Sequence, residues 1–108
     1  MRINEIYTAY ISWAGGGKRR PILIMKTNDD SFSFFKITSK YQSKSDYIKA
    51  HYYPIQEWEK AGLNKQSYID TLNLLDLPNN FVNLQYVGHL TRKDRIGLSR
   101  FIEDLKFK

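Results

Sequence analysis

The sequence contains no cysteine, only three prolines in 108 residues and no long apolar run. Without cysteine, disulfides, thiolate catalysis and cysteine-ligated metal sites are excluded. The two histidines, His51 and His89, are widely separated and do not form a zinc motif. No apolar segment has the length of a membrane span or of the central region of a signal peptide. We therefore expect a soluble, cytoplasmic protein with no membrane segment, metal or other cofactor.

Acidic residues are scarce relative to basic ones. Seventeen Lys and Arg residues oppose 11 Asp and Glu residues, so the formal net charge is +6. Three stretches carry much of the excess: 18–20, 36–44 and 92–100. An excess of this size favours a polyanionic partner, either nucleic acid or an acidic protein segment, although basic surfaces also serve solubility alone.

The sequence does have the apolar content of one folded domain. Hydrophobic residues make up 42% and aromatic residues 15% of the chain, and no linker or repeat divides residues 1–108. Strand-like patterns cover 3–11, 20–27, 31–38, 66–70 and 72–77, of which the last two form one bent strand or two short ones. The pattern predicts a mainly β protein with appended helices, in the α+β class.

The segments between these strands carry turn, loop and helix signals. Residues 28–30 read as a hairpin turn, and residues 12–19 as a loop. Residues 40–53 are polar and irregular, which predicts a mobile loop. A short helix is predicted from Pro54 to Ala61, followed by Gly62 as a C-terminal stop.

The clearest helix signal is at the C-terminus. Thr91 is placed as an N-cap, and Asp94 follows three residues later as a variant of the capping box. Apolar residues then recur at helical spacing: Ile96, Leu98, Phe101, Ile102 and Leu105. We expect this stripe to lie on the sheet.

The most informative motif is the basic, glycine-rich stretch 15–21, which leads into an apolar strand. Glycines let a backbone approach a ligand closely, and the planar guanidinium of Arg20 matches the oxygens of a phosphate. Pro21 favours the start or the edge of a strand. The motif therefore predicts a phosphate contact, with an ordinary solvated hairpin loop as the alternative.

The order of motifs resembles the MazF/PemK toxin family. The resemblance rests on the Arg20-Pro21 pair, a strand that ends in Ile37-Thr38-Ser39, the segment 58–63 and the segment 69–76. It implies an SH3-like β-barrel with a C-terminal helix, usually a homodimer, that cleaves single-stranded RNA without metal and is inhibited by an acidic antitoxin. The chain departs from the family pattern in its first loop, which lacks an acidic residue, and at Tyr68, where some members have arginine.

By this resemblance Arg20, Thr38 and Asp70 match catalytic positions. Arg20 would stabilise the charge on the phosphate, Thr38 would donate its hydroxyl, and Asp70 would accept the proton of the RNA 2′-OH. We expect the substrate to be bound by the neighbouring residues Lys18, Arg19, Ser39 and Lys40. The products would be a 2′,3′-cyclic phosphate and a 5′-hydroxyl end.

Each assignment has a structural alternative. Threonine at the end of a strand is common without function, and Asp70 is equally suited to capping a turn or pairing with a lysine. His51 and His89 are interpreted as structural. Several aromatic residues flank basic ones and are candidates for stacking on bases, or for filling a core or dimer contact: Trp13, Tyr41, Tyr47, Tyr52 and Tyr53.

Two other functions remain open from the sequence. One is a non-catalytic RNA- or DNA-binding barrel that retains the basic surface without the chemistry. The other is an interaction module that binds an acidic antitoxin and has no nuclease activity.

Overall fold

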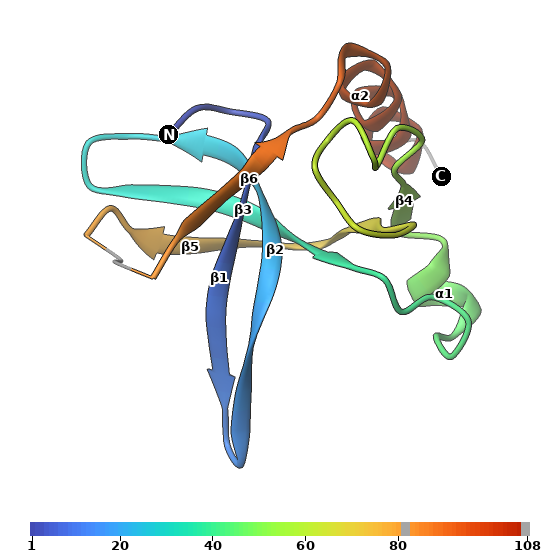
Figure 1. Cartoon of the computed structure of the whole chain (residues 1–108). Helices are drawn as coiled ribbons and strands as arrows, with labels where there is room; N and C mark the ends of the chain where they lie inside the picture. Colours follow the sequence, from blue (N-terminus) through green and yellow to red (C-terminus); the bar gives the residue numbers. More distant parts are fainter. Residues whose placement is uncertain (81–82, 107–108) are drawn as a thin grey trace.

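The computed structural model describes residues 1–80 and 83–106 as a curled, six-stranded antiparallel sheet with a C-terminal helix (Figure 1). The strand order is β4-β5-β3-β2-β1-β6. This architecture agrees with the predicted α+β class. The strands are β1 (Glu5–Trp13), β2 (Gly16–Thr27), β3 (Ser31–Thr38), β4 (Tyr52–Pro54), β5 (Tyr68–Pro78) and β6 (Gln85–His89).

The predicted loop at 12–19 is wrong, because β1 and β2 continue as one long hairpin. Their ladder runs out to the pair Trp13 and Gly16, and only a tight turn at Ala14 and Gly15 joins them. Gly15 has a φ of 89°, which glycine adopts without strain. The basic residues after the turn therefore lie on a strand. Figure 1 shows this hairpin projecting from the rest of the sheet.

The predicted hairpin of β2 and β3 is confirmed. Its turn is held by the Asn28 side chain, whose Oδ1 accepts hydrogen bonds from the backbone N–H groups of Asp30 and Ser31. The two predicted strand segments, 66–70 and 72–77, fall on one bent strand, β5, which begins at Tyr68 and ends at Pro78. Its bend coincides with a register shift against β3 between Phe34 and Lys36.

The segment 40–53 contains regular structure that the sequence reading missed. The short helix α1 (Asp46–Lys49) begins after Ser45, whose hydroxyl accepts a hydrogen bond from the Ile48 N–H. Tyr52 and Tyr53 then enter β4 and pair with β5.

The helix predicted from Pro54 to Ala61 is also wrong, and the segment is a series of turns. Asp94, which is fully buried, supplies the physical reason. Its carboxylate accepts hydrogen bonds from the backbone N–H groups of Gln56 and Glu57 and from the Tyr53 hydroxyl. These bonds hold the chain in turns and tie it to the C-terminal helix.

That helix, α2 (Arg92–Lys106), forms where it was predicted. Leu98 is buried in the core, and Phe101 and Ile102 pack against it, whereas Ile96 is 43% exposed and lies outside the contact. The Thr91 hydroxyl donates to Glu57 Oε1, so its side chain joins the turn segment to the start of the helix. In the described ranges, neither helix has the length and apolar character needed to cross a membrane.

Two buried clusters lie on opposite faces of the sheet. Leu23, Phe35 and Ile37 belong to the cluster beneath α2, whereas Ile22 and Phe34 belong to the second cluster. Side chains alternate between faces along a strand. Polar residues that continue the second face beyond Ile22 and Phe34 therefore lie away from α2, and these residues form the candidate site.

Candidate functional site

Arg20, Thr38 and Asp70 line one hollow of about 370 Å³, although they come from three different strands. We call this the first hollow. Its lining residues are mostly basic or polar: Arg20, Lys36, Ile37, Thr38, Lys40, Lys44, Tyr52 and Asp70. The structure thus brings together all three residues that the resemblance assigns to catalysis.

The strand register explains this grouping. Asp70 lies on β5, which runs between β3 and β4 in the sheet. It pairs with Lys36 of β3 on one side and with Tyr52 of β4 on the other. Directly opposed residues on adjacent strands have neighbouring side chains on one face. Thr38 lies two residues beyond Lys36 and Arg20 two residues before Ile22, so both side chains project from the same face.

Asp70 is the acidic residue of the first hollow and is 8% exposed. Its Oδ1 accepts a hydrogen bond from the Leu72 N–H at 3.0 Å, which fixes the carboxylate. Within the described ranges it forms no salt bridge at 4.0 Å or less. Burial raises the pKa of the Tyr52 hydroxyl, and the negative charge of Asp70 raises it further. The carboxylate is thus held in place beside cations without a direct ion pair.

Thr38 is fixed by the turn that follows β3. Its Oγ1 accepts a hydrogen bond from the Lys40 N–H at 3.1 Å. The hydroxyl keeps its proton for donation, and the turn brings Lys40 to the edge of the hollow. This geometry suits a threonine that donates to an anionic oxygen.

A second hollow of about 440 Å³ adjoins the first, and both are lined by Arg20, Thr38 and Lys40. The four residues predicted to bind substrate, Lys18, Arg19, Ser39 and Lys40, all line it. Nη1 of Arg19 donates to Thr8 O, Thr8 Oγ1 and Asn83 O, so part of this guanidinium braces the sheet. The opposite wall comes from the segment 62–67.

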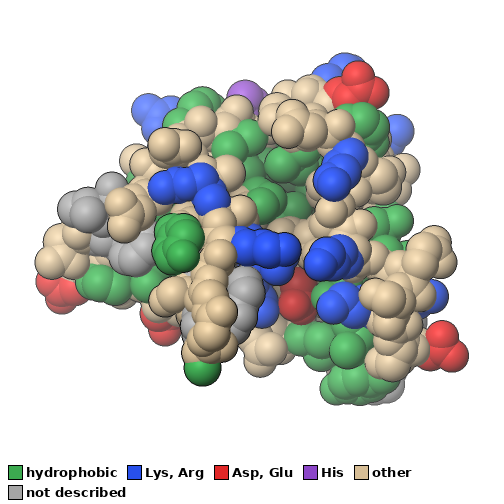
Figure 2. Space-filling view, turned by 60° about the horizontal axis from the view of Figure 1, so that its bottom comes forward, with side chains coloured by type: hydrophobic (Ala, Val, Ile, Leu, Met, Phe, Trp, Pro, Cys, Tyr) green, Lys and Arg blue, Asp and Glu red, His purple; other side chains and the backbone are tan. Residues whose placement is uncertain are grey.

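The surface of the two hollows is strongly basic. Seven cationic side chains line them: Lys18, Arg19, Arg20, Lys36, Lys40, Lys44 and Lys65. Among the residues that the structure describes, Asp70 is the one acidic residue in either lining. Figure 2 shows Lys and Arg side chains gathered around a depression with an acidic group between them. Such a surface attracts a polyanion.

The tyrosines proposed to stack on bases differ in their surroundings. Tyr41 stacks on Tyr68 with ring centroids 4.4 Å apart, and Lys49 Nζ lies 5.1 Å from the Tyr41 centroid. Tyr53 is buried and donates a hydrogen bond to Asp94, and the Tyr47 ring packs beside the His51 ring. Tyr52 alone among these tyrosines lines the first hollow. The side chain of Trp13 lies outside the described residues.

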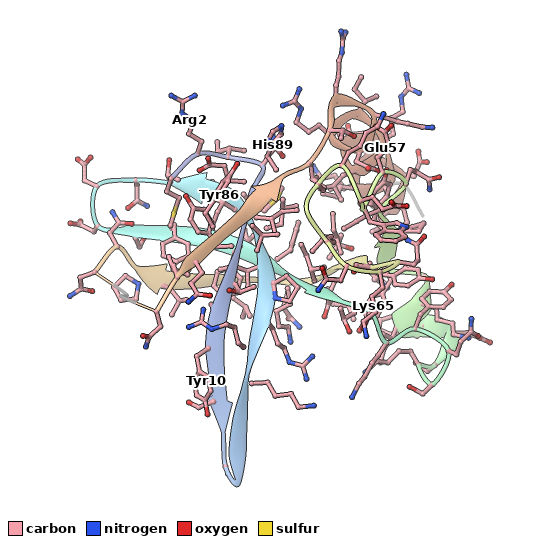
Figure 3. All side chains as sticks on the ribbon, viewed as in Figure 1. Arg2, Tyr10, Glu57, Lys65, Tyr86 and His89 are labelled. Carbon is pink, nitrogen blue, oxygen red and sulfur yellow. The ribbon has the colours of Figure 1, made fainter. Side chains whose placement is uncertain are left out.

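Neither histidine lines a hollow. Nδ1 of His51 lies 2.8 Å from the carbonyl oxygen of Tyr47, in the turn after α1. His89 lies at the end of β6, where it pairs with Glu5 (Figure 3). Within the described ranges, no group of three or more His, Asp or Glu residues is arranged to hold a metal ion.

Three lysines that line the hollows, Lys36, Lys44 and Lys65, were not among the predicted site residues, and Tyr52 was predicted only as a candidate for stacking on bases. A signal existed for Lys36, because it lies two residues before Thr38 on a strand and therefore shares its face. Tyr52 and Lys65 are positioned by the pairing of β4 with β5 and by the turns before β5, which no local pattern reveals.

A scan against protein-family models and a search of curated proteins find no match to this chain.

Proposed function

We propose that this protein is a MazF/PemK-type toxin with an SH3-like barrel that cleaves single-stranded RNA without a metal ion. The supporting observation is that Arg20, Thr38 and Asp70, which are 18 and 32 residues apart in sequence, line one basic hollow. A surface that is basic overall and carries one buried carboxylate fits a reaction at a phosphodiester.

In the proposed reaction, the ribose 2′-oxygen attacks the adjacent phosphorus and its proton passes to the Asp70 carboxylate. The bond from phosphorus to the 5′-oxygen breaks, and that oxygen leaves with a proton from solvent. The products are a 2′,3′-cyclic phosphate and a 5′-hydroxyl end. Because DNA lacks the 2′-OH, it is not cleaved.

Arg20 and Thr38 act on the charge that develops in the transition state. The Arg20 guanidinium donates two parallel hydrogen bonds to the phosphate oxygens, and the Thr38 hydroxyl donates another. A preorganised donor of this kind contributes on the order of a hundredfold or more to the rate. Both side chains project from paired strands on one face of the sheet, and the Thr38 hydroxyl is also fixed by its hydrogen bond from the Lys40 N–H.

The proposal includes the partners implied by the resemblance. An acidic, disordered antitoxin segment would fold across the basic hollows and exclude RNA, because both ligands are polyanions. The toxin would act as a homodimer in the cytoplasm. Calorimetry that measures competition between a synthetic antitoxin peptide and RNA tests whether the antitoxin segment excludes RNA.

The test of the activity is digestion of a long single-stranded RNA in EDTA, beside a DNA of the same sequence. The proposal predicts RNA fragments cut at a short recurring sequence and intact DNA. If the protein binds RNA in a salt-sensitive way but leaves it intact, the non-catalytic barrel replaces the nuclease. If the protein binds only the acidic peptide and not RNA, the interaction module replaces the nuclease as the proposed function.

A further inference from the structure

We infer that the second hollow is a binding site for the nucleotide next to the scissile phosphate, in which Lys65 contacts the backbone phosphate and Asn64 contacts the base. The inference rests on the proposed function, because it extends the path of the RNA beyond Arg20. Neither Lys65 nor Asn64 is part of the catalytic set.

The first support is the continuity of the two hollows. Arg20, Thr38 and Lys40 line both, so a phosphate held at these residues lies at their junction. An RNA chain that enters along Asp70 and Tyr52 and passes this junction reaches the second hollow. At about 440 Å³, this space is within the range of roughly 300 to 1,000 Å³ found for small-molecule sites.

The second support is the bracing of the wall that carries Asn64 and Lys65. A Cβ on Gly62 would lie 2.5 Å from Val87 O, so this turn packs directly against β6. The buried Ser67 hydroxyl donates to Lys65 O at 2.9 Å, and Gln66 Nε2 donates to Ile55 O at 3.0 Å. A wall fixed at both ends holds the backbone of Asn64 and Lys65 in a defined position.

The third support is the chemistry of the lining. In the described part of the chain, the lining of the second hollow has five cationic residues and no acidic one: Lys18, Arg19, Arg20, Lys40 and Lys65. Lys65 is exposed and lines the second hollow together with Ser39 and Lys40, which follow β3. Its ammonium group suits a phosphate, whereas the Asn64 carboxamide has the donors and acceptor that read the edge of an unpaired base. The hollow therefore fits an anionic nucleotide.

The test is binding of a fluorescein-labelled, mixed-sequence single-stranded DNA of 20 nucleotides, which lacks the 2′-OH and is not cleaved. We compare wild type, Lys65→Met and the control Lys26→Met, which removes one exposed lysine of β2 outside both hollows. Lys65→Met should bind on the order of threefold more weakly and lower the slope of log K against log salt by about 0.7. Lys26→Met should preserve the wild-type slope.

If the two variants bind alike, or if wild type does not bind this DNA, the inference is overturned. This result is independent of cleavage, since a wild type that binds DNA but leaves RNA intact would remove the nuclease and keep the site. For an active enzyme, Asn64→Ala should relax the base preference at one position beside the cut. An unchanged cleavage pattern in Asn64→Ala would overturn the role given to Asn64.

Discussion

Lys36 and Asp70 are direct partners across the β3–β5 ladder, and both side chains line the first hollow. The sheet thus places a cation and a carboxylate on one face beside Arg20 and Thr38. In the proposed reaction these two charges have opposite effects on the substrate. Lys36 attracts the phosphate backbone, whereas Asp70 repels it and accepts the proton of the nucleophile.

Replacing Asp70 by asparagine should therefore separate binding from chemistry. Asp70→Asn removes the acceptor, and cleavage should fall by roughly 10² to 10⁴. The same change removes the one acidic group that the described residues contribute to the hollows, so a non-cleavable oligonucleotide should bind more tightly. Single-turnover cleavage and fluorescence anisotropy measure the two effects.

The matched control for this experiment is Asp76→Asn. Asp76 lies on the same strand, accepts a hydrogen bond from Ser33 and lines neither hollow. It should leave the cleavage rate close to that of wild type. Equal rates for Asp70→Asn and wild type would exclude Asp70 as the base.

Asp94 should be essential for stability and not for chemistry. Asp94→Ala leaves three buried or partly buried donors without their acceptor, at Tyr53, Gln56 and Glu57. We expect a loss of about 3 kcal/mol or more in the free energy of unfolding, measured with urea. Tyr53→Phe removes one of these bonds and should cost about 1 kcal/mol. A similar loss in both variants would contradict this account of the turn segment.

Tyr53 should also make the protein sensitive to alkali. Burial raises the pKa of its hydroxyl above the ordinary value of 10.0, and the hydrogen bond to Asp94 raises it further. The unfolded chain therefore releases this proton first as the pH rises. The stabilisation is complete below about pH 10 and is lost progressively above it.

Urea unfolding of wild type and Tyr53→Phe between pH 8 and pH 11 measures this effect. The variant should lose less stability above pH 10 than wild type. Some loss should remain in the variant, because burial also raises the pKa of Tyr7 and Tyr52. Parallel curves for the two proteins would show that Tyr53 does not couple folding to pH.

Local patterns predicted the elements whose stabilising contacts are close in sequence. Alternation and the Asn28 turn located the β2–β3 hairpin, and helical spacing located α2. The turns after Pro54 could not be predicted, because the Asp94 carboxylate that holds them is 37 and 38 residues away. The long β1–β2 hairpin was missed because three successive glycines read as a loop, although two of them lie on β2.

The candidate site shows the same division. Arg20, Thr38 and Asp70 were proposed from the order of motifs. Lys36 could have been predicted from the alternation of side chains along a strand, because it lies two residues before Thr38. The partnership of Asp70 with Tyr52 depends on the pairing of β4 with β5, and the position of the chain at Lys65 depends on the contact of Gly62 with β6. Such long-range contacts are determined by the whole fold and have no local signature.

The most direct test of the central claim compares wild type with Arg20→Ala on one long single-stranded RNA in EDTA, with the fragment ends mapped. The account predicts 2′,3′-cyclic phosphate and 5′-hydroxyl ends for wild type, and a rate on the order of a hundredfold or more lower for the folded variant. Fragments that end in a 3′-hydroxyl and a 5′-phosphate, or equal cleavage by both proteins, would contradict it.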